Sequence, residues 1–267
     1  MNKLERCEQA KKWVRYIETE HSDEIQHSIT NSTRYRSNPI LEITSNITND
    51  TVMSVDDINT IQAIFKYRKK YPGHRIAALN FASYKHPGGG FLAGMYAQEE
   101  SLCHQSTLYG VLRSYNHVYY EPHKSSLNRG LYGHDILYTP DIWFQKIPGY
   151  EDTYCDIITC AAPNWGAARR NGVTEQELMD VFGERILSIL RIAEITHVDI
   201  LILGAFGCGV FKNTPSMVAT LFKSIISKCN STLMHAIFAI PDKYSTNYKI
   251  FNHIITGEEI NYYAIKD

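Results

Sequence analysis

The sequence predicts an α/β fold in which a central sheet is covered by helices on both faces. Residues 75–81, 156–162 and 198–203 are apolar almost throughout, which is typical of strands buried on both sides. Helical patterns separate these segments along the chain, and this alternation favours a layered sheet. Ligands bind beyond the carboxyl ends of strands in such sheets, and glycine-rich runs follow 75–81 and 198–203.

The N-terminal part of the chain indicates a helical extension. Apolar residues recur near helical spacing up to about residue 30, with charges between them. A loop is expected over 31–39 and a short strand over 41–44. We therefore predict an extension over residues 1–40 and a single domain over residues 41–267, because no repeat or linker interrupts the rest.

Further elements follow from caps and periodicity. Ser54 and Asp57 resemble a capping box, so we expect a helix over about 54–71 that ends near Pro72 and Gly73. The remaining predicted elements are a helix through about 114, helices over 174–195 and 216–227, and a strand over 235–240.

Composition excludes several classes of protein. The chain has 27 basic and 28 acidic residues and no long basic block, so a reader of duplex nucleic acid is not expected. The six cysteines are scattered, without zinc spacing, and the histidines form no obvious metal pair. No run approaches the ~20 apolar residues that span a bilayer. We expect a cytoplasmic protein without a bound metal or cofactor.

The most informative stretch combines three consecutive glycines with an amide and two acids: Gly88, Gly89, Gly90, Gln98, Glu99 and Glu100. Consecutive glycines let a backbone pass close to a ligand, because no Cβ intervenes and positive φ is easily adopted. Paired carboxylates supply acid–base chemistry. Together they indicate chemistry on a phosphorylated sugar. The second glycine-rich segment supplies another wall of the site: Gly204, Ala205, Phe206, Gly207, Cys208, Gly209, Val210 and Phe211.

Residues 80–100 resemble the signature of microbial poly(ADP-ribose) glycohydrolases, in which three glycines and a spacer precede Gln-Glu-Glu. Four more blocks look like this family's recurring blocks, in the same order: residues 108–109, 138–141, 161–164 and 204–211. The resemblance covers roughly residues 40–255. It implies a macrodomain-like three-layer α/β/α sandwich with a mixed central sheet, which binds ADP-ribose and hydrolyses a glycosidic bond at its distal ribose.

The resemblance also implies roles for the motif residues. Glu100 would be the general acid/base, Glu99 would hold ribose hydroxyls, and Gln98 would orient the loop. The three glycines would wrap the distal ribose and a phosphate, and residues 204–209 would form a second diphosphate loop with backbone N–H groups. Phe211 would pack against ribose or base, although an ordinary core position is nearly as compatible with its pattern.

Other residues near the motif keep alternative interpretations. Asn80 and Ser83 are placed to contact the ribose. Met95 and Tyr96 occupy a spacer where small or polar residues are common in the family, so they are expected to shape the substrate mouth. Residues 115–135, rich in tyrosine and histidine, either cover the pocket or form a solvated loop. Asn164 supports the pocket or caps a loop. Cys208 has no histidine or aspartate placed by the sequence to activate it as a nucleophile.

The leading functional hypothesis is a hydrolase that releases ADP-ribose from poly(ADP-ribose) or from ADP-ribosylated protein. A hydrolase of mono-ADP-ribosylated side chains, linked through Ser, Glu or Arg, would use the same pocket. A macrodomain that only binds ADP-ribose would lack the acid that Glu100 supplies. A dinucleotide-dependent oxidoreductase would need a different glycine spacing. The expected partners are ADP-ribose or poly(ADP-ribose) on modified proteins, with neither duplex nucleic acid nor membrane.

Overall fold

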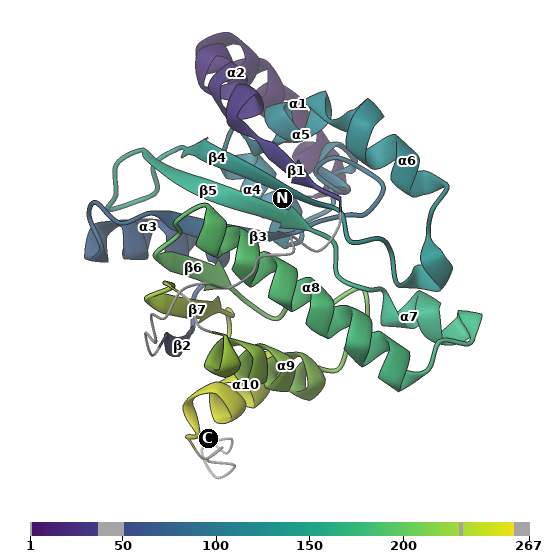
Figure 1. The fold of residues 1–267 in the computed structure, drawn as a ribbon. Coiled ribbons are helices and arrows are strands. Elements are labelled where there is room, and N and C mark those ends of the chain that lie inside the picture. The colour runs from purple at the N-terminus through teal and green to yellow at the C-terminus, as the bar shows by residue number, and fades with distance from the viewer. Residues whose placement is uncertain (1, 37–50, 230–231, 259–267) are drawn as a thin grey trace.

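A seven-stranded mixed sheet organises the structure, a computed structural model that describes residues 2–36, 51–229 and 232–258 (Figure 1). The strands are β1 (Thr33–Tyr35), β2 (Val52–Asp56), β3 (Ile76–Phe81), β4 (Ile136–Phe144), β5 (Thr153–Cys160), β6 (Ile200–Leu203) and β7 (His235–Ala239). Their order is β1-β4-β5-β3-β6-β7-β2. Strand β4 is antiparallel to both its neighbours, whereas β5, β3, β6, β7 and β2 run parallel. The predicted mixed α/β sheet is confirmed.

Helices cover both faces of this sheet. They are α1 (Lys3–Glu20), α2 (Ser22–Asn31), α3 (Thr60–Lys70), α4 (Gln98–Gln105), α5 (Leu108–Ser114), α6 (Glu121–Lys124), α7 (Trp165–Ala168), α8 (Glu175–Ile195), α9 (Pro215–Lys228) and α10 (Thr246–Thr256), with the short turns η1 (Phe91–Ala93), η2 (Asn116–Tyr120), η3 (Asn128–Gly130) and η4 (Arg169–Asn171). Helices α8, α9 and α10 bury apolar side chains in one core cluster, and α1, α3, α4 and α5 do so in a second (Figure 1). This is the predicted three-layer sandwich.

Strand β3 shows why its segment is apolar throughout. Ala77 and Leu79 lie in the core cluster with α8 and α9, while Ile76 and Ala78 lie in the cluster with α3 and α4. Because both faces are buried, no polar face interrupts the pattern. The strands predicted at 75–81, 156–162, 198–203 and 235–240 correspond to β3, β5, β6 and β7, with shifted ends.

The long helices also follow the sequence patterns. Helix α8 begins after Thr174, whose side chain accepts a hydrogen bond from the Glu177 N–H in a capping box. Its buried residues face the sheet, as its amphipathic pattern requires. Helix α9 extends the predicted helix over 216–227 by one residue at each end.

The N-terminal helices pack against the site side of the domain. Helix α1 lies against the loop that carries η1, where the Arg6 Nε donates to the Gly94 carbonyl at 2.8 Å. Trp13 donates to the Ser106 carbonyl at 3.1 Å. The predicted helix over residues 1–30 is broken at His21, between α1 and α2. The boundary predicted at residue 40 and the strand predicted over 41–44 lie outside the described residues.

Two predicted segments are wrong near the ends of the sheet. The loop predicted over 31–39 contains β1, which pairs with β4. The helix predicted from residue 54 starts only at Thr60, because residues 52–56 form β2 and pair with β7. The capping box of this helix is formed by Asn59 and Gln62 instead.

Three further elements differ from expectation. The helix predicted through residue 114 is split into α4 and α5 at Ser106 and Thr107. Strand β4 was not predicted, because Pro140 interrupts its pattern; a register shift between Thr139 and Ile142 accommodates the proline. Helix α10 was not predicted either.

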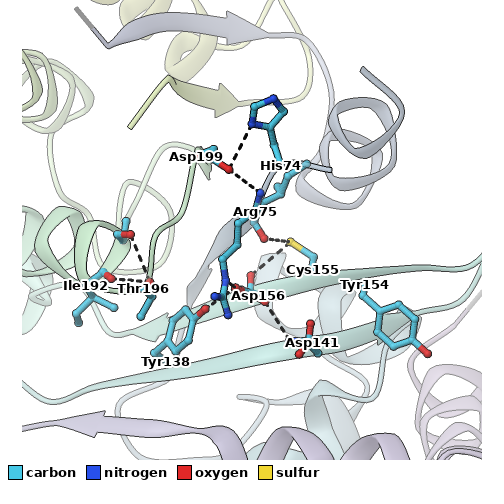
Figure 2. A network of polar contacts seen from close by, with 12 residues as sticks. His74, Arg75, Tyr138, Asp141, Tyr154, Cys155, Asp156, Ile192, Thr196 and Asp199 are labelled. Atoms are coloured by element: carbon cyan, nitrogen blue, oxygen red, sulfur yellow. Dashed lines mark hydrogen bonds and ion pairs between the residues drawn. The ribbon is translucent and has the colours of Figure 1, made fainter. Parts of the chain in front are cut away.

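A network of polar groups occupies the edge of the sheet where the parallel strands begin (Figure 2). Asp156 on β5 is buried and accepts hydrogen bonds from the Arg75 Nε at 2.7 Å, the Asp141 N–H at 3.0 Å and the Tyr138 hydroxyl. The Arg75 N–H donates to Asp199 at 2.8 Å. These bonds give the buried carboxylate its partners, so we assign it a structural role at the edge opposite the glycine loops.

Candidate active site

The two glycine-rich loops lie at one edge of the sheet. Strands β3 and β6 are adjacent and parallel, and each loop follows the carboxyl end of one of them. The Phe81 and Phe206 rings lie 5.5 Å apart, and a Cβ added to Gly204 would meet the Phe81 ring at 3.0 Å. The loops are therefore neighbours, as the sequence predicts.

Gly89 lies directly against both acids. A Cβ at this position would meet the Glu100 Oε1 at 2.6 Å and the Glu99 Oε2 at 2.9 Å. Gly88 and Gly89 have φ values of +66° and +58°, which L-residues with side chains rarely adopt. Glycine is therefore required here by backbone conformation and by the close approach of two carboxyl groups.

Glu100 is held at the start of α4 by backbone donors. Its Oε1 accepts the Gly90 N–H at 2.8 Å, and its Oε2 accepts the Ala97 N–H at 3.0 Å. The bond from Ala97 is the return bond of a helix cap, and the bond from Gly90 reaches across to the glycine loop. These two donors fix the orientation of a nearly buried carboxyl group.

Glu99 is buried, and its surroundings perturb its ionisation. Burial raises its pKa to about 8, and the charge of Glu100 adds to this, against hydrogen bonds from Ser83, Asn80 and Gly88 that favour the ionised form. The Ser83 N–H donates to the Glu99 Oε2 at 2.7 Å, and the Asn80 Nδ2 donates to its Oε1 at 3.4 Å. At pH 7 the Glu99 carboxyl group is therefore mostly neutral.

Asn80 can pair with either protonation state of Glu99. It is fully buried on β3, and its Oδ1 has no hydrogen-bond partner, while its Nδ2 lies 3.4 Å from both the Glu99 Oε1 and the Thr159 Oγ1. A half-turn of the amide would place Oδ1 beside the Glu99 Oε1. The protonated Glu99 would then donate to it.

The raised pKa of Glu99 predicts how stability depends on pH. A free glutamate titrates near 4.5, so between about pH 4.5 and 8 the folded protein retains a proton that the unfolded chain has lost. The free energy of unfolding therefore falls as pH rises through this window, and the loss is complete above pH 8. Glu99→Gln should remove this pH-dependent contribution. Between pH 4 and pH 9 the free energy of unfolding of the variant should therefore fall by on the order of 4 kcal/mol less than that of the unsubstituted protein. Urea unfolding of both proteins at the two pH values measures this difference. If the two proteins differed in free energy of unfolding by the same amount at pH 4 and at pH 9, the assignment would be contradicted.

Gln98 positions α4 against the sheet. Its Oε1 accepts the Phe81 N–H at 2.9 Å, and its Nε2 donates to the Leu79 carbonyl at 2.8 Å and to the Thr60 hydroxyl at 3.2 Å. Both ends of the amide are engaged within the protein. The structure thus favours the predicted orienting role over direct contact with a ligand.

Local hydrogen bonds fix the conformation of the glycine loop and of the turn at Ser83. The Gly89 N–H donates to the His86 carbonyl at 3.0 Å, and the Gly90 N–H donates to Glu100. The Ser83 hydroxyl accepts the N–H groups of Lys85 and His86 at 3.3 and 3.2 Å. Ser83 therefore shapes the turn with its side chain and holds Glu99 with its N–H.

The second loop is braced by a residue that sequence reasoning missed. The Asn213 Nδ2 donates to the Pro163 carbonyl at 2.8 Å and to the Gly207 carbonyl at 3.0 Å. Gly207 has a φ of +72°, and a Cβ there would meet the Asn213 Nδ2 at 2.5 Å. No local pattern marks this asparagine, since its partners are two separate carbonyls.

The side chains of the second loop divide between core and surface. Phe206 is fully buried between Phe81 and Phe182, so it belongs to the core. Cys208 is mostly buried, and burial raises the pKa of its thiol to about 12, which argues against a nucleophile. Phe211 is half-buried, with its ring 5.9 Å from that of Tyr132. The remaining predicted loop residues, Gly204, Ala205, Gly209 and Val210, lie along the same turn.

The segment over residues 115–135 is structured rather than a solvated loop. His123 is buried, stacks on Tyr84 at 4.1 Å and bonds the Tyr84 carbonyl at 3.0 Å and Asp135 at 2.8 Å. Burial opposes ionisation of Asp135, but hydrogen bonds from Arg34 and His123 outweigh it and lower its pKa. Arg34 on β1 is thus linked through Asp135 and His123 to Tyr84, in the turn that follows β3. Asn164 donates to the Tyr132 hydroxyl and caps α7, which is the capping alternative of the two.

Two further observations concern residues 2–36, 51–229 and 232–258. Within these ranges no three His, Cys, Asp or Glu side chains are grouped so that they would hold a metal ion. No helix in the same ranges is sufficiently long and apolar to cross a membrane.

Known proteins share this architecture. The family model described as microbial-type PARG, catalytic domain, matches residues 5–146, which is more than half of the chain. The poly(ADP-ribose) glycohydrolase of Thermomonospora curvata is 26% identical, with 95% of this chain and 98% of that chain covered and a TM-score of 0.81. The poly(ADP-ribose) glycohydrolase of Deinococcus radiodurans in complex with ADP-ribose is 27% identical, with 87% and 97% covered and a TM-score of 0.73. No curated protein matched the sequence.

Proposed function

Because the chain belongs to the microbial-type poly(ADP-ribose) glycohydrolase family, we propose that it hydrolyses the glycosidic bond at the distal ribose of ADP-ribose units. The product would be ADP-ribose, released from poly(ADP-ribose) or from ADP-ribosylated protein. Similar structures include a Thermomonospora curvata enzyme with the inhibitor ADP-HPD and a Deinococcus radiodurans enzyme with ADP-ribose. The observation that carries the proposal is the contact of Gly89 with both Glu99 and Glu100 beside the second glycine loop.

The chemistry follows from two carboxyl groups with different surroundings. In its protonated form, Glu100 gives its proton to the leaving oxygen as the bond to the anomeric carbon breaks. A water molecule then forms a new bond to that carbon, and Glu100 takes back a proton from it. Gly90 and Ala97 keep the Glu100 carboxyl group in one orientation, so the same oxygens serve both steps.

Glu99 suits a different task. A neutral carboxyl group offers one donor and one acceptor, and ribose hydroxyls can pair with both because each hydroxyl donates as well as accepts. Its raised pKa keeps it neutral at pH 7, and Ser83 and Asn80 hold it in place. We therefore assign Glu99 to the distal ribose and Glu100 to proton transfer.

Product analysis tests this proposal. The protein is incubated with poly-ADP-ribosylated protein and with proteins mono-ADP-ribosylated on Ser, Glu or Arg, and released nucleotides are separated by chromatography. We expect free ADP-ribose from the polymer. Release from a mono-modified protein would extend the substrate to that side-chain linkage. Tight binding of ADP-ribose without release from any substrate would instead favour a binding module.

A further inference from the structure

Three exposed apolar side chains lie in the segment that joins the glycine loop to the acids, and we call them the lip: Leu92, Met95 and Tyr96. Leu92, Met95 and Tyr96 have 42%, 53% and 69% of their surface exposed. Met95 and Glu100 both lie close to Gly90, because a Cβ at Gly90 would meet the Met95 Cγ at 2.4 Å and the Glu100 Oε1 at 3.5 Å. An exposed apolar cluster beside a site is typical of a surface that contacts a ligand.

Tyr96 is the aromatic member of this lip and is supported from one side. It precedes Ala97, whose N–H holds the Glu100 Oε2 at 3.0 Å. Its ring centroid lies 6.5 Å from that of His104, which in turn packs edge-on against Phe91 at 4.6 Å. The Tyr96 ring therefore has a packed neighbour while most of its surface stays open.

The position next to Glu100 indicates which part of the substrate meets the lip. A general acid lies beside the leaving oxygen, so the leaving group extends on the Glu100 side. In poly(ADP-ribose) the leaving group is another ADP-ribose unit, with an adenine base and a diphosphate. In a mono-ADP-ribosylated protein it is an amino-acid side chain without a base.

The chemistry of the lip matches the polymer. Aromatic side chains bind bases of any sequence by stacking. Arg6 on α1 donates to the Gly94 carbonyl at 2.8 Å and so anchors the loop that carries the lip. We propose that Tyr96 stacks on the adenine of the departing ADP-ribose unit and so selects polymer over mono-ADP-ribosylated protein. This inference rests on the proposed function.

Two measurements separate this inference from the proposed function. Calorimetry compares the binding of ADP-ribose with that of an ADP-ribose dimer. It is carried out on the Glu100→Gln protein and on the same protein with Tyr96→Ala added. We expect Tyr96→Ala to weaken dimer binding about tenfold and to leave ADP-ribose binding unchanged, because one stacked base is lost. Tyr96→Phe keeps the stacking face and should retain the dimer affinity.

Tyr154→Ala is the matched control, since Tyr154 is 45% exposed but lies on β5 away from both glycine loops. It should leave both affinities unchanged. The stacking role would be overturned if Tyr96→Ala left the dimer affinity unchanged. It would also be overturned if the substitution weakened dimer binding and ADP-ribose binding equally. Turnover of polymer by the otherwise unchanged protein is measured in parallel, and its absence would count against the proposed function alone.

Discussion

Glu100→Gln should lower the turnover of poly(ADP-ribose) by about 100- to 10,000-fold, the usual contribution of a general acid. ADP-ribose affinity should change by less than about threefold, because glutamine keeps the shape of the side chain and ADP-ribose has no leaving group to protonate. Release of ADP-ribose gives the rate, and calorimetry gives the affinity. Undiminished turnover would exclude Glu100 as the acid.

The control for Glu100→Gln must lose the same kind of hydrogen bond at the start of a helix. Both Glu100 oxygens accept N–H groups, so the new amide nitrogen faces a donor and one hydrogen bond is lost. Glu177 has the same capping position on α8, where it accepts the Thr174 N–H at 2.8 Å. Glu177→Gln should therefore lower thermal stability in the same direction without abolishing turnover.

Gly89→Ala should abolish turnover and weaken ADP-ribose binding by at least about tenfold. The new methyl group would stand 2.6 Å from the Glu100 Oε1 and 2.9 Å from the Glu99 Oε2, so both carboxyl groups must move. A left-handed alanine adds roughly 1–2 kcal/mol of backbone strain. Turnover and calorimetric affinity are measured on the same preparation.

Gly149→Ala isolates the backbone strain from the contact with the acids. Gly149 has a φ of +86°, and a Cβ there would meet nothing within 4 Å. We expect this variant to lose some stability while binding and turnover stay normal. If Gly89→Ala behaved in the same way, the glycine loop would not be the substrate cradle.

Strands buried on both faces were predictable because burial leaves a continuous apolar pattern. That pattern located β3 and β6, and their shared direction placed the two glycine loops at one edge. The sequence predicts the start of the helix at residue 54, inside β2, because Ser54 and Asp57 resemble a cap, while pairing with β7 decides the structure. Long-range pairing is not visible in a local pattern.

The motif located the acids, but their environments were not predictable. The neutral state of Glu99 depends on burial and on the neighbouring Glu100, which outweigh the hydrogen bonds from Ser83 and from Asn80 on β3. Asn213 and Asp135 act through partners that are distant along the chain. Such contacts follow from the packing of separate elements, so the sequence reveals them only after the fold is known.

A crystal structure of the Glu100→Gln protein with ADP-ribose tests the central claim most directly. We expect the diphosphate between the loop at Gly88–Gly90 and the loop at residues 204–211, with the distal ribose hydroxyls at Glu99 and the anomeric carbon facing residue 100. ADP-ribose bound at another edge of the sheet, or with its distal ribose turned away from both acids, would contradict it.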